Sequence, residues 1–207
     1  QGEDMGRIDA AILRSVEGRL RRLGRPTLDL IQLHNHIAFQ RQPEQDPDLI
    51  DLHDLDTVRR TFETLQQQGK VRFWGITGLG ASEALHEAVA SGGFQSIQIP
   101  YNLLNPSAGT MVTSTFAFQD YGLLIEQALQ QGMGVIAIRI LAGGALSGIT
   151  ERHPVASPSV NPIASEQEYK DDVARAKRYA YLVENGVVSS LAEAAVRFAV
   201  SKSGIST

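Results

Sequence analysis

Two histidines in the first part of the chain are well suited to proton chemistry. His34 directly follows the apolar run of residues 28–33, and His36 lies two positions further on. A histidine at the end of a buried strand points toward the mouth of a sheet, where its imidazole can polarise a carbonyl group or transfer a proton. A histidine that only caps the strand end fits the same pattern, and His36 is expected in the following loop. The pair could also bind zinc, but no third ligand has suitable spacing, so we expect no metal site.

Glycines follow a second apolar run, where Gly75, Gly78 and Gly80 lie around Thr77. Glycine lets backbone N–H groups approach an anion at a helix N-terminus, so this turn is a candidate phosphate loop. The spacing is not the G-x-G-x-x-G of a Rossmann fold, and no acidic residue near Gln98 is available to hold a ribose. A tight turn between a strand and a helix explains the glycines equally well.

A second glycine-rich segment, residues 141–148, contains Gly143 and Gly144. A glycine-rich loop after a late barrel strand is a common phosphate site. Gln98 stands out for another reason, because it is a polar residue inside a short apolar run and a buried amide needs hydrogen-bond partners. A ligand amide would be a suitable partner, and so would an internal hydrogen bond.

The elements that would position these residues alternate between short apolar runs and helical patterns. The runs are residues 28–33, 71–76, 96–99 and 134–138, which are rich in Ile, Leu and Val, as in strands buried on both faces of a parallel sheet. A capping-box pattern from Ser190 to Glu193 predicts the start of a late helix. The predicted fold class is α/β with a parallel sheet, either doubly wound or a barrel.

Long loops are expected over residues 35–54, 101–118 and 148–166, each after the carboxyl end of a strand, where α/β enzymes build their sites. Residues 1–207 are expected to form one domain. The chain begins at Gln1 shortly before a patterned helix, and residues 204–207 resemble the start of a strand. Because a complete domain usually ends in a polar tail or a finished element, we expect this domain to be incomplete at both ends.

Composition excludes several classes of function. The 207 residues carry a net charge of −4, and the one basic cluster, from Arg14 to Arg25, alternates with apolar positions, so no nucleic-acid surface is expected. The absence of cysteine excludes disulfides and thiolate metal sites. No apolar run approaches the roughly 20 residues of a membrane span and no signal peptide opens the chain, so a soluble cytoplasmic protein is expected. The sequence carries no signal for an oligomeric state.

Taken together, the ordered segments resemble one enzyme family, the aldo-keto reductases. The likeness runs from about Arg7 to Thr207, and its order and spacing are more specific than any one motif. It rests on SVEGRLRRL at 15–23, LDLIQLH at 28–34, GKVRFWGITG at 69–78, QIPYN at 98–102 and GVIAIRILAGG at 134–144.

This resemblance implies a (β/α)8 TIM barrel of the aldo-keto reductase type that binds NADPH, or less often NADH, without a Rossmann domain. Such an enzyme passes a hydride from the nicotinamide to a small-molecule aldehyde or ketone, while a tyrosine donates the proton. The family's catalytic histidine corresponds to His34. The residues that correspond to its cofactor contacts are Thr77, Gly78 and Gln98 at the nicotinamide carboxamide, Ile138 where an aromatic ring often stacks on the nicotinamide, and Arg139, Leu141 and Gly143 at the pyrophosphate.

The chain departs from the family's pattern at two cofactor contacts. Thr77 and Gly78 replace a Ser-Asn pair, which keeps a hydroxyl group and loses an amide. Ile138 is apolar but has no aromatic face.

The catalytic residues show a larger departure. The family's Asp, Tyr and Lys come from the first three β/α units, ahead of the part that this chain resembles, which corresponds to strands four to seven. Tyr101, Lys70 and Asp54 are not at the matching positions. The resemblance therefore predicts an oxidoreductase whose chemistry this chain alone does not complete. A non-catalytic binding or structural protein that keeps this part of the barrel is one alternative, and a barrel enzyme for another phosphate-bearing ligand is a second.

Overall fold

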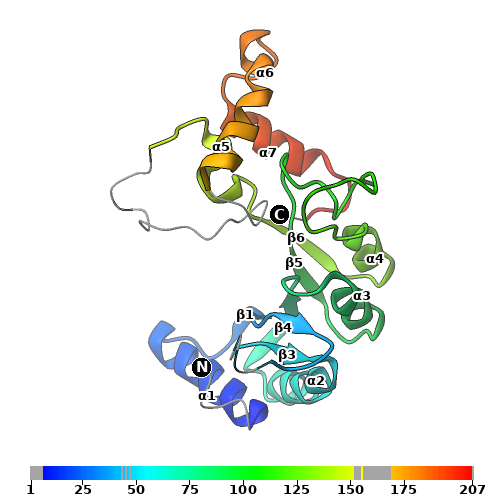
Figure 1. Cartoon of the computed structure of the whole chain (residues 1–207). Helices are drawn as coiled ribbons and strands as arrows, with labels where there is room; N and C mark the ends of the chain where they lie inside the picture. Colours follow the sequence, from blue (N-terminus) through cyan, green and yellow to red (C-terminus); the bar gives the residue numbers. More distant parts are fainter. Residues whose placement is uncertain are drawn as a thin grey trace. The chain divides into compact units, whose positions relative to one another are not determined.

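The structure is a computed structural model that describes residues 7–42, 44, 46, 48–151, 155 and 169–206. The chain divides into two compact units, residues 1–98 with 127–134 (unit 1) and residues 99–126 with 135–207 (unit 2). Figure 1 shows the elements in chain order, which are α1 (Ile8–Leu23), β1 (Leu28–Leu33), β2 (Ile37–Ala38), β3 (Ile50–Asp51), α2 (Leu52–Gln67), β4 (Val71–Thr77), α3 (Ser82–Ala90), β5 (Ser96–Pro100), α4 (Leu124–Gln130), β6 (Gly134–Ile138), the 3₁₀ helix η2 (Ala142–Ser147), α5 (Tyr169–Ala176), the 3₁₀ helix η3 (Lys177–Tyr179), α6 (Tyr181–Glu184) and α7 (Leu191–Ser201).

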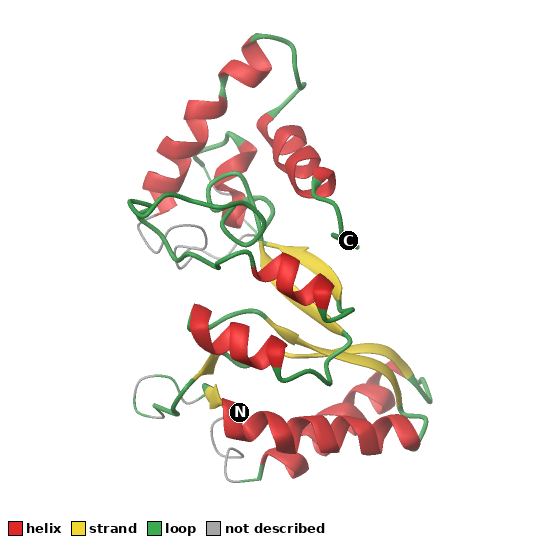
Figure 2. Cartoon of the chain, turned by 90° about the vertical axis from the view of Figure 1, so that its right-hand side faces the viewer, coloured by secondary structure: helices red, strands yellow, loops and turns green. Residues whose placement is uncertain are grey.

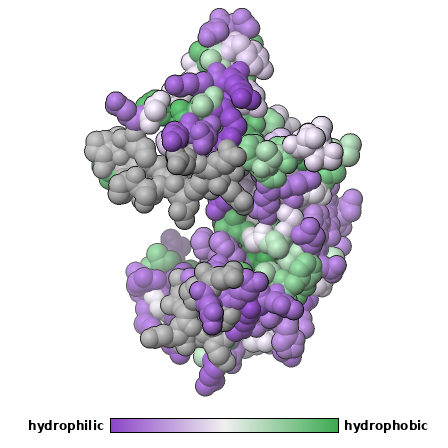
Figure 3. Space-filling view, viewed as in Figure 1, coloured by the Kyte–Doolittle hydropathy of each residue, from purple (hydrophilic) through white to green (hydrophobic). Residues whose placement is uncertain are grey.

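The first helix of unit 1 forms as its apolar spacing predicts. Ile12 and Val16 are buried, while the arginines of the basic cluster are exposed, so that cluster is the solvated face of a helix. The helix ends at Gly24, whose φ of 61° turns the chain so that the Arg25 N–H donates to the Leu20 carbonyl at 3.1 Å. Hydrophilic residues predominate over the helices of unit 1 in the space-filling view (Figure 3).

Three strands of unit 1 form a parallel ladder in which β4 lies between β1 and β5. Strands and helices alternate along this unit (Figure 2), and the ring of Trp74 in β4 stacks on Phe62 of α2 with 6.2 Å between ring centroids. One face of the ladder is therefore covered by helix. On the other face the paired residues Leu30 and Phe73 are 41% and 49% exposed within the described residues. The expectation of burial on both faces is thus wrong for β1 and this part of β4, because the helices of unit 1 cover only one side.

The segment predicted as a long loop over residues 35–54 contains structure that the sequence did not reveal. β2 pairs with β3 in parallel, and α2 already begins at Leu52. Asp51 caps that helix through a capping box in which its carboxylate accepts from the Asp54 N–H and the Asp54 carboxylate accepts from the Asp51 N–H. The prediction failed because a two-residue strand has no periodicity and because the box uses Asp where Glu or Gln is usual.

Unit 2 has its own apolar core. It packs residues of η2, α5 and α7 together with the loop after β5, and its buried members are Leu104, Ala142, Ala145, Leu146, Val173, Ala176 and Ala195. Within this unit the end of β5 lies beside β6, and the Tyr101 N–H donates to the Ile138 carbonyl at 3.2 Å. Ile205 forms a parallel bridge with Val135, in agreement with the strand-like pattern of residues 204–207.

The last helix begins at the predicted cap, with one difference. The Ser190 hydroxyl accepts from the Glu193 N–H at 3.1 Å, as in a capping box. The Glu193 carboxylate does not return to Ser190 but accepts from the N–H and the hydroxyl of Ser189, at 2.6 and 2.5 Å.

Most of the loop predicted over residues 148–166 lies outside the described residues. No helix in the described part of the chain is long and apolar enough to cross a membrane.

Candidate functional site

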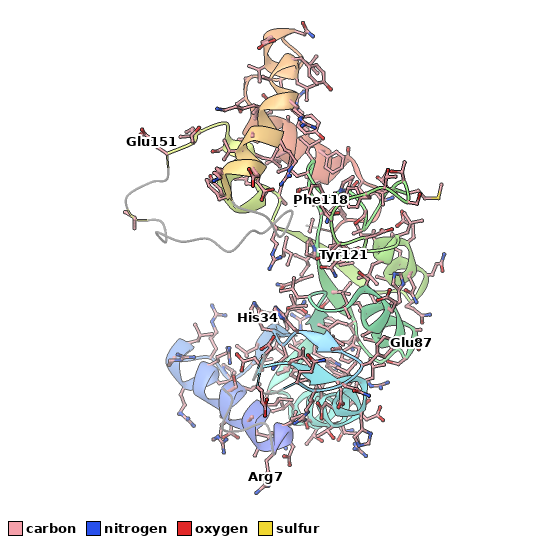
Figure 4. All side chains as sticks on the ribbon, viewed as in Figure 1. Arg7, His34, Glu87, Phe118, Tyr121 and Glu151 are labelled. Atoms are coloured by element: carbon pink, nitrogen blue, oxygen red, sulfur yellow. The ribbon has the colours of Figure 1, made fainter. Side chains whose placement is uncertain are left out.

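Three of the predicted site residues lie in one row across neighbouring strands of unit 1, with His34 just after β1, Thr77 at the end of β4 and Gln98 within β5. Thr77 pairs with Gln98, and Leu33 pairs with Ile76, so His34 follows β1 at the level of Thr77. Because side chains alternate between the two faces of a strand, the three residues share the face that is not covered by helices. The side chain of His34 is exposed at the end of β1 (Figure 4). No described residue hydrogen-bonds to its imidazole.

The threonine and the glutamine of this row are joined by a hydrogen bond. The Thr77 hydroxyl donates to Oε1 of Gln98 at 3.1 Å, and the Gly78 N–H donates to the Gln98 carbonyl at 2.6 Å. Thr77 is 1% exposed, so its hydroxyl is fixed. Among the described residues Nε2 of Gln98 has no partner, which leaves two N–H donors for another molecule.

A second polar row lies directly below the first. Gln32, Gly75 and Ser96 are paired neighbours, and Nε2 of Gln32 donates to the Ser96 hydroxyl at 2.9 Å. A Cβ atom on Gly75 would lie 2.1 Å from the Ser96 carbonyl oxygen and 2.7 Å from Oε1 of Gln32, so this strand position requires glycine. Gln32 was not predicted as a site residue, although its position two residues before His34 on a strand places both on one face.

The remaining predicted residues lie in unit 2, at the end of β6 and in the turn after it. Ile138 and Arg139 are half-buried, and the side chain of Leu141 is 38% exposed. Arg139 has a φ of 58° and Gly143 a φ of 67°, both in the left-handed region. Such a succession of turns exposes backbone N–H groups on one side and is typical of anion-binding loops.

A cavity of about 400 Å³ in unit 1 borders the other side of His34. It lies between α1 and β1, with Ile12, Ile31 and Leu33 among its apolar walls and Arg14 at its rim. Thr77 and Gln98 are not among its lining residues. Of the three residues of the row, only His34 lines this cavity.

The second histidine is placed differently. Nδ1 of His36 lies 3.1 Å from a carboxylate oxygen of Asp46 in the loop after β1. No group of three His, Asp or Glu side chains in the described ranges could hold a metal ion. His36 thus belongs to the internal contacts of its loop.

Comparison with known proteins gives the family. The model of the aldo/keto reductase family matches residues 4–207, almost the entire chain. The chain belongs to the aldo/keto reductase family. None of the curated proteins compared with it matches.

Solved structures support the aldo-keto reductase fold. A glycerol dehydrogenase from Gluconobacter oxydans superimposes with a TM-score of 0.62 at 22% identity, over 95% of this chain and 53% of its own. The holo form of an aldo-keto reductase from Bacillus halodurans gives 0.59 at 21% identity, over 96% and 53%. The fold is therefore the α/β barrel type of this family, and the chain spans about half the length of these relatives.

Proposed function

We propose that the protein is an NAD(P)H-dependent oxidoreductase that reduces an aldehyde or ketone to an alcohol, or catalyses the reverse reaction. The observation that supports this most strongly is the row of His34, Thr77 and Gln98 on one face of three neighbouring strands, with His34 and Thr77 at the carboxyl ends of theirs. Active sites of (β/α)8 enzymes lie at this end of the strands. The substrate is a small carbonyl compound, and the cofactor is NADP, with NAD as the second choice.

The donors and acceptors of the row fit a nicotinamide carboxamide. An amide ligand needs both a donor and an acceptor, and Nε2 of Gln98 is a donor whose orientation is fixed by the Thr77 hydroxyl. Gly78 adds no side chain at this point, and its N–H donates to the Gln98 carbonyl. When bound, the cofactor supplies the hydride, while the protein groups hold and orient its ring.

The turn after β6 is assigned to the phosphate part of the cofactor from the family resemblance and from its own backbone. We assign Arg139 and the backbone of Leu141 and Gly143 to the pyrophosphate, because a guanidinium and exposed N–H groups both favour an anion. Ile138 would give the nicotinamide an apolar contact.

His34 is the proposed carbonyl-polarising residue. Its exposed imidazole can donate a hydrogen bond to the substrate oxygen, where negative charge grows as hydride is added. The 207 residues have no tyrosine, aspartate or lysine that matches the rest of the family's catalytic set. We therefore propose that these residues alone do not reduce carbonyls and that the reaction belongs to the natural full-length protein.

Cofactor binding by the natural full-length protein tests this function. Gln98→Glu keeps the acceptor for Thr77 but replaces the two N–H donors by an acceptor oxygen. A lost buried hydrogen bond costs about 1–3 kcal/mol, so the NADPH dissociation constant should rise about five-fold or more. Gln131→Glu makes the same chemical change at an exposed position and serves as the matched control.

Three results would count against the proposal. They are failure of the wild type to bind either nicotinamide cofactor, equal dissociation constants for the Gln98→Glu and Gln131→Glu proteins, and no reduction of any member of a broad aldehyde and ketone panel. NADPH fluorescence titration gives the first two, and loss of NADPH absorbance gives the third.

A further inference from the structure

Asn102 is a buried amide in unit 2 that the proposed function does not use. It follows β5 by two residues, and it is 1% exposed. Its side chain nevertheless has three partners. Oδ1 accepts from the N–H groups of Leu104 and Asn105, both at 2.9 Å, and Nδ2 donates to the Arg139 carbonyl at 3.2 Å. The amide therefore joins two loops that are 37 residues apart in the sequence.

The carbonyl that Asn102 binds belongs to an unusual backbone position. Arg139 has a φ of 58°, which is rare for a residue other than glycine, asparagine or aspartate. Such a conformation persists only where the surroundings determine it. Here the Arg139 carbonyl accepts twice, from the Asn102 amide and from the Ala142 N–H at 2.8 Å. The two bonds close the turn that leads into Gly143 and Gly144.

A neighbouring network of hydrogen bonds holds the rest of the loop after β5. Oδ1 of Asn105 accepts from the N–H and the hydroxyl of Ser107, and its Nδ2 donates to the Gln119 carbonyl at 2.9 Å. The Ser107 hydroxyl in turn accepts from the Tyr121 N–H at 3.0 Å. Asn105 and Ser107 are 4% and 0% exposed, so this network is a fixed support rather than a surface contact.

We propose that Asn102 is a positioning residue, whose side-chain amide holds residues 139–144 in the conformation that clasps the cofactor pyrophosphate. The cofactor part of this statement rests on the proposed function, while the hold on the loop does not. Asn102 itself does not touch the cofactor. It acts through the Arg139 carbonyl, which fixes the direction of the following N–H groups.

Two isosteric substitutions separate this role from a general structural one. Asn102→Asp keeps the acceptor for Leu104 and Asn105 but replaces the donor to Arg139 by an oxygen that repels the carbonyl. Asn105→Asp makes the same change in the same network but removes the donor to Gln119, so it is the matched control. Asn102→Ala is made in parallel, because it removes the donor without adding a buried charge.

Hydrogen–deuterium exchange of the natural full-length protein without cofactor is the first measurement. Loss of the Asn102 donor should speed exchange of residues 139–146 by at least about five-fold. Amide hydrogens exchange when the loop opens, and one such hydrogen bond shifts the equilibrium between the closed and the open loop by a factor on the order of five. In the Asn105→Asp protein these residues should exchange as in wild type, while residues 105–121 exchange faster. Wild-type exchange of residues 139–146 in both Asn102 variants would overturn the proposal.

The NADPH dissociation constant is the second measurement. It should rise several-fold in the Asn102 variants and stay near the wild-type value in Asn105→Asp. Faster exchange with an unchanged dissociation constant would overturn the positioning role. If the wild type binds no nicotinamide cofactor, the proposed function fails, and faster exchange in the Asn102 variants would still support Asn102 as the residue that holds this loop.

Discussion

The backbone of Ile37 lies directly against Gly80. The Ile37 N–H donates to the Leu79 carbonyl at 2.9 Å, and the Ile37 carbonyl accepts from the Ala81 N–H at 3.0 Å. A Cβ atom on Gly80 would lie 2.0 Å from the Ile37 carbonyl oxygen, and the φ of Gly80 is 131°. The segment after His34 is thereby attached to the turn after Thr77, which joins the loops that follow two neighbouring members of the proposed row.

Gly80→Ala should therefore destabilise unit 1 and displace the loop after β1. Both the left-handed backbone and the clash with Ile37 must be relieved, so the free energy of unfolding should fall by more than about 2 kcal/mol. Gly69→Ala is the control, because Gly69 has a φ of 70° but open space where its Cβ would be, and it should cost about 1 kcal/mol. Denaturant unfolding of both variants checks the difference. Equal losses would show that the contact with Ile37 contributes nothing.

Elements encoded by a local sequence pattern were predictable, whereas those that depend on contacts between distant residues, such as Ile37 with Gly80, were not. The strands at residues 28–33 and 134–138 agree with the structure to the residue, because a continuous apolar run is a local signal. The strand β2 is two residues long and is held by its pairing with β3 and by the backbone bonds of Ile37 to Leu79 and Ala81, which no local pattern encodes. No local pattern encodes the hydrogen bond of Asn102 either, because its partner Arg139 is distant in the sequence.

The candidate site was predictable to a similar extent. The resemblance to aldo-keto reductases selected His34, Thr77 and Gln98, but only the strand register puts them at one level. Gln32 was not predicted, because its partners Gly75 and Ser96 lie on other strands, although alternation along β1 places it on the face of His34.

Thr77→Val should weaken cofactor binding without removing apolar bulk. The substitution leaves Oε1 of Gln98 without its donor, which should cost about 1–2 kcal/mol of stability and raise the NADPH dissociation constant several-fold. Thr77→Ser keeps the hydroxyl and should bind NADPH nearly as wild type does. Fluorescence titration of both proteins decides the point, and identical dissociation constants for the two variants would exclude the hydroxyl from the site.

The start of α7 should contribute to stability in a pH-dependent way. Hydrogen bonds from the side chain and then the backbone of Ser189 hold the pKa of Glu193 below its ordinary value. A carboxylate whose pKa is depressed by folding stabilises the fold above its unfolded pKa, about 4.3, and this contribution is lost as the pH falls through the lower, folded value. Glu193→Gln should therefore lower the melting temperature at pH 7, and its difference from wild type should shrink toward pH 3.

Thermal melts across this pH range, recorded on wild type, Glu193→Gln and Ser189→Ala, test the assignment. Ser189→Ala removes the hydroxyl donor and should lose part of the same pH-dependent stability. A melting-temperature difference that stays constant from pH 7 to pH 3 would mean that Glu193 does not titrate with folding.

The last prediction concerns His34 in the natural full-length protein. If its imidazole donates to the substrate oxygen, its contribution is largest in the transition state, so His34→Ala should lower kcat more than it weakens NADPH binding. Removal of one such donor lowers kcat by about 10²–10³ in a well-studied oxyanion site, which sets the expected scale. His36→Ala is the matched control, since His36 lies two residues on and contacts Asp46 of its own loop. The competing structural role predicts a lower melting temperature with normal turnover per folded molecule, so melting temperature and kcat are measured on the same samples. A stably folded His34→Ala protein with near-normal kcat would remove this residue from the mechanism.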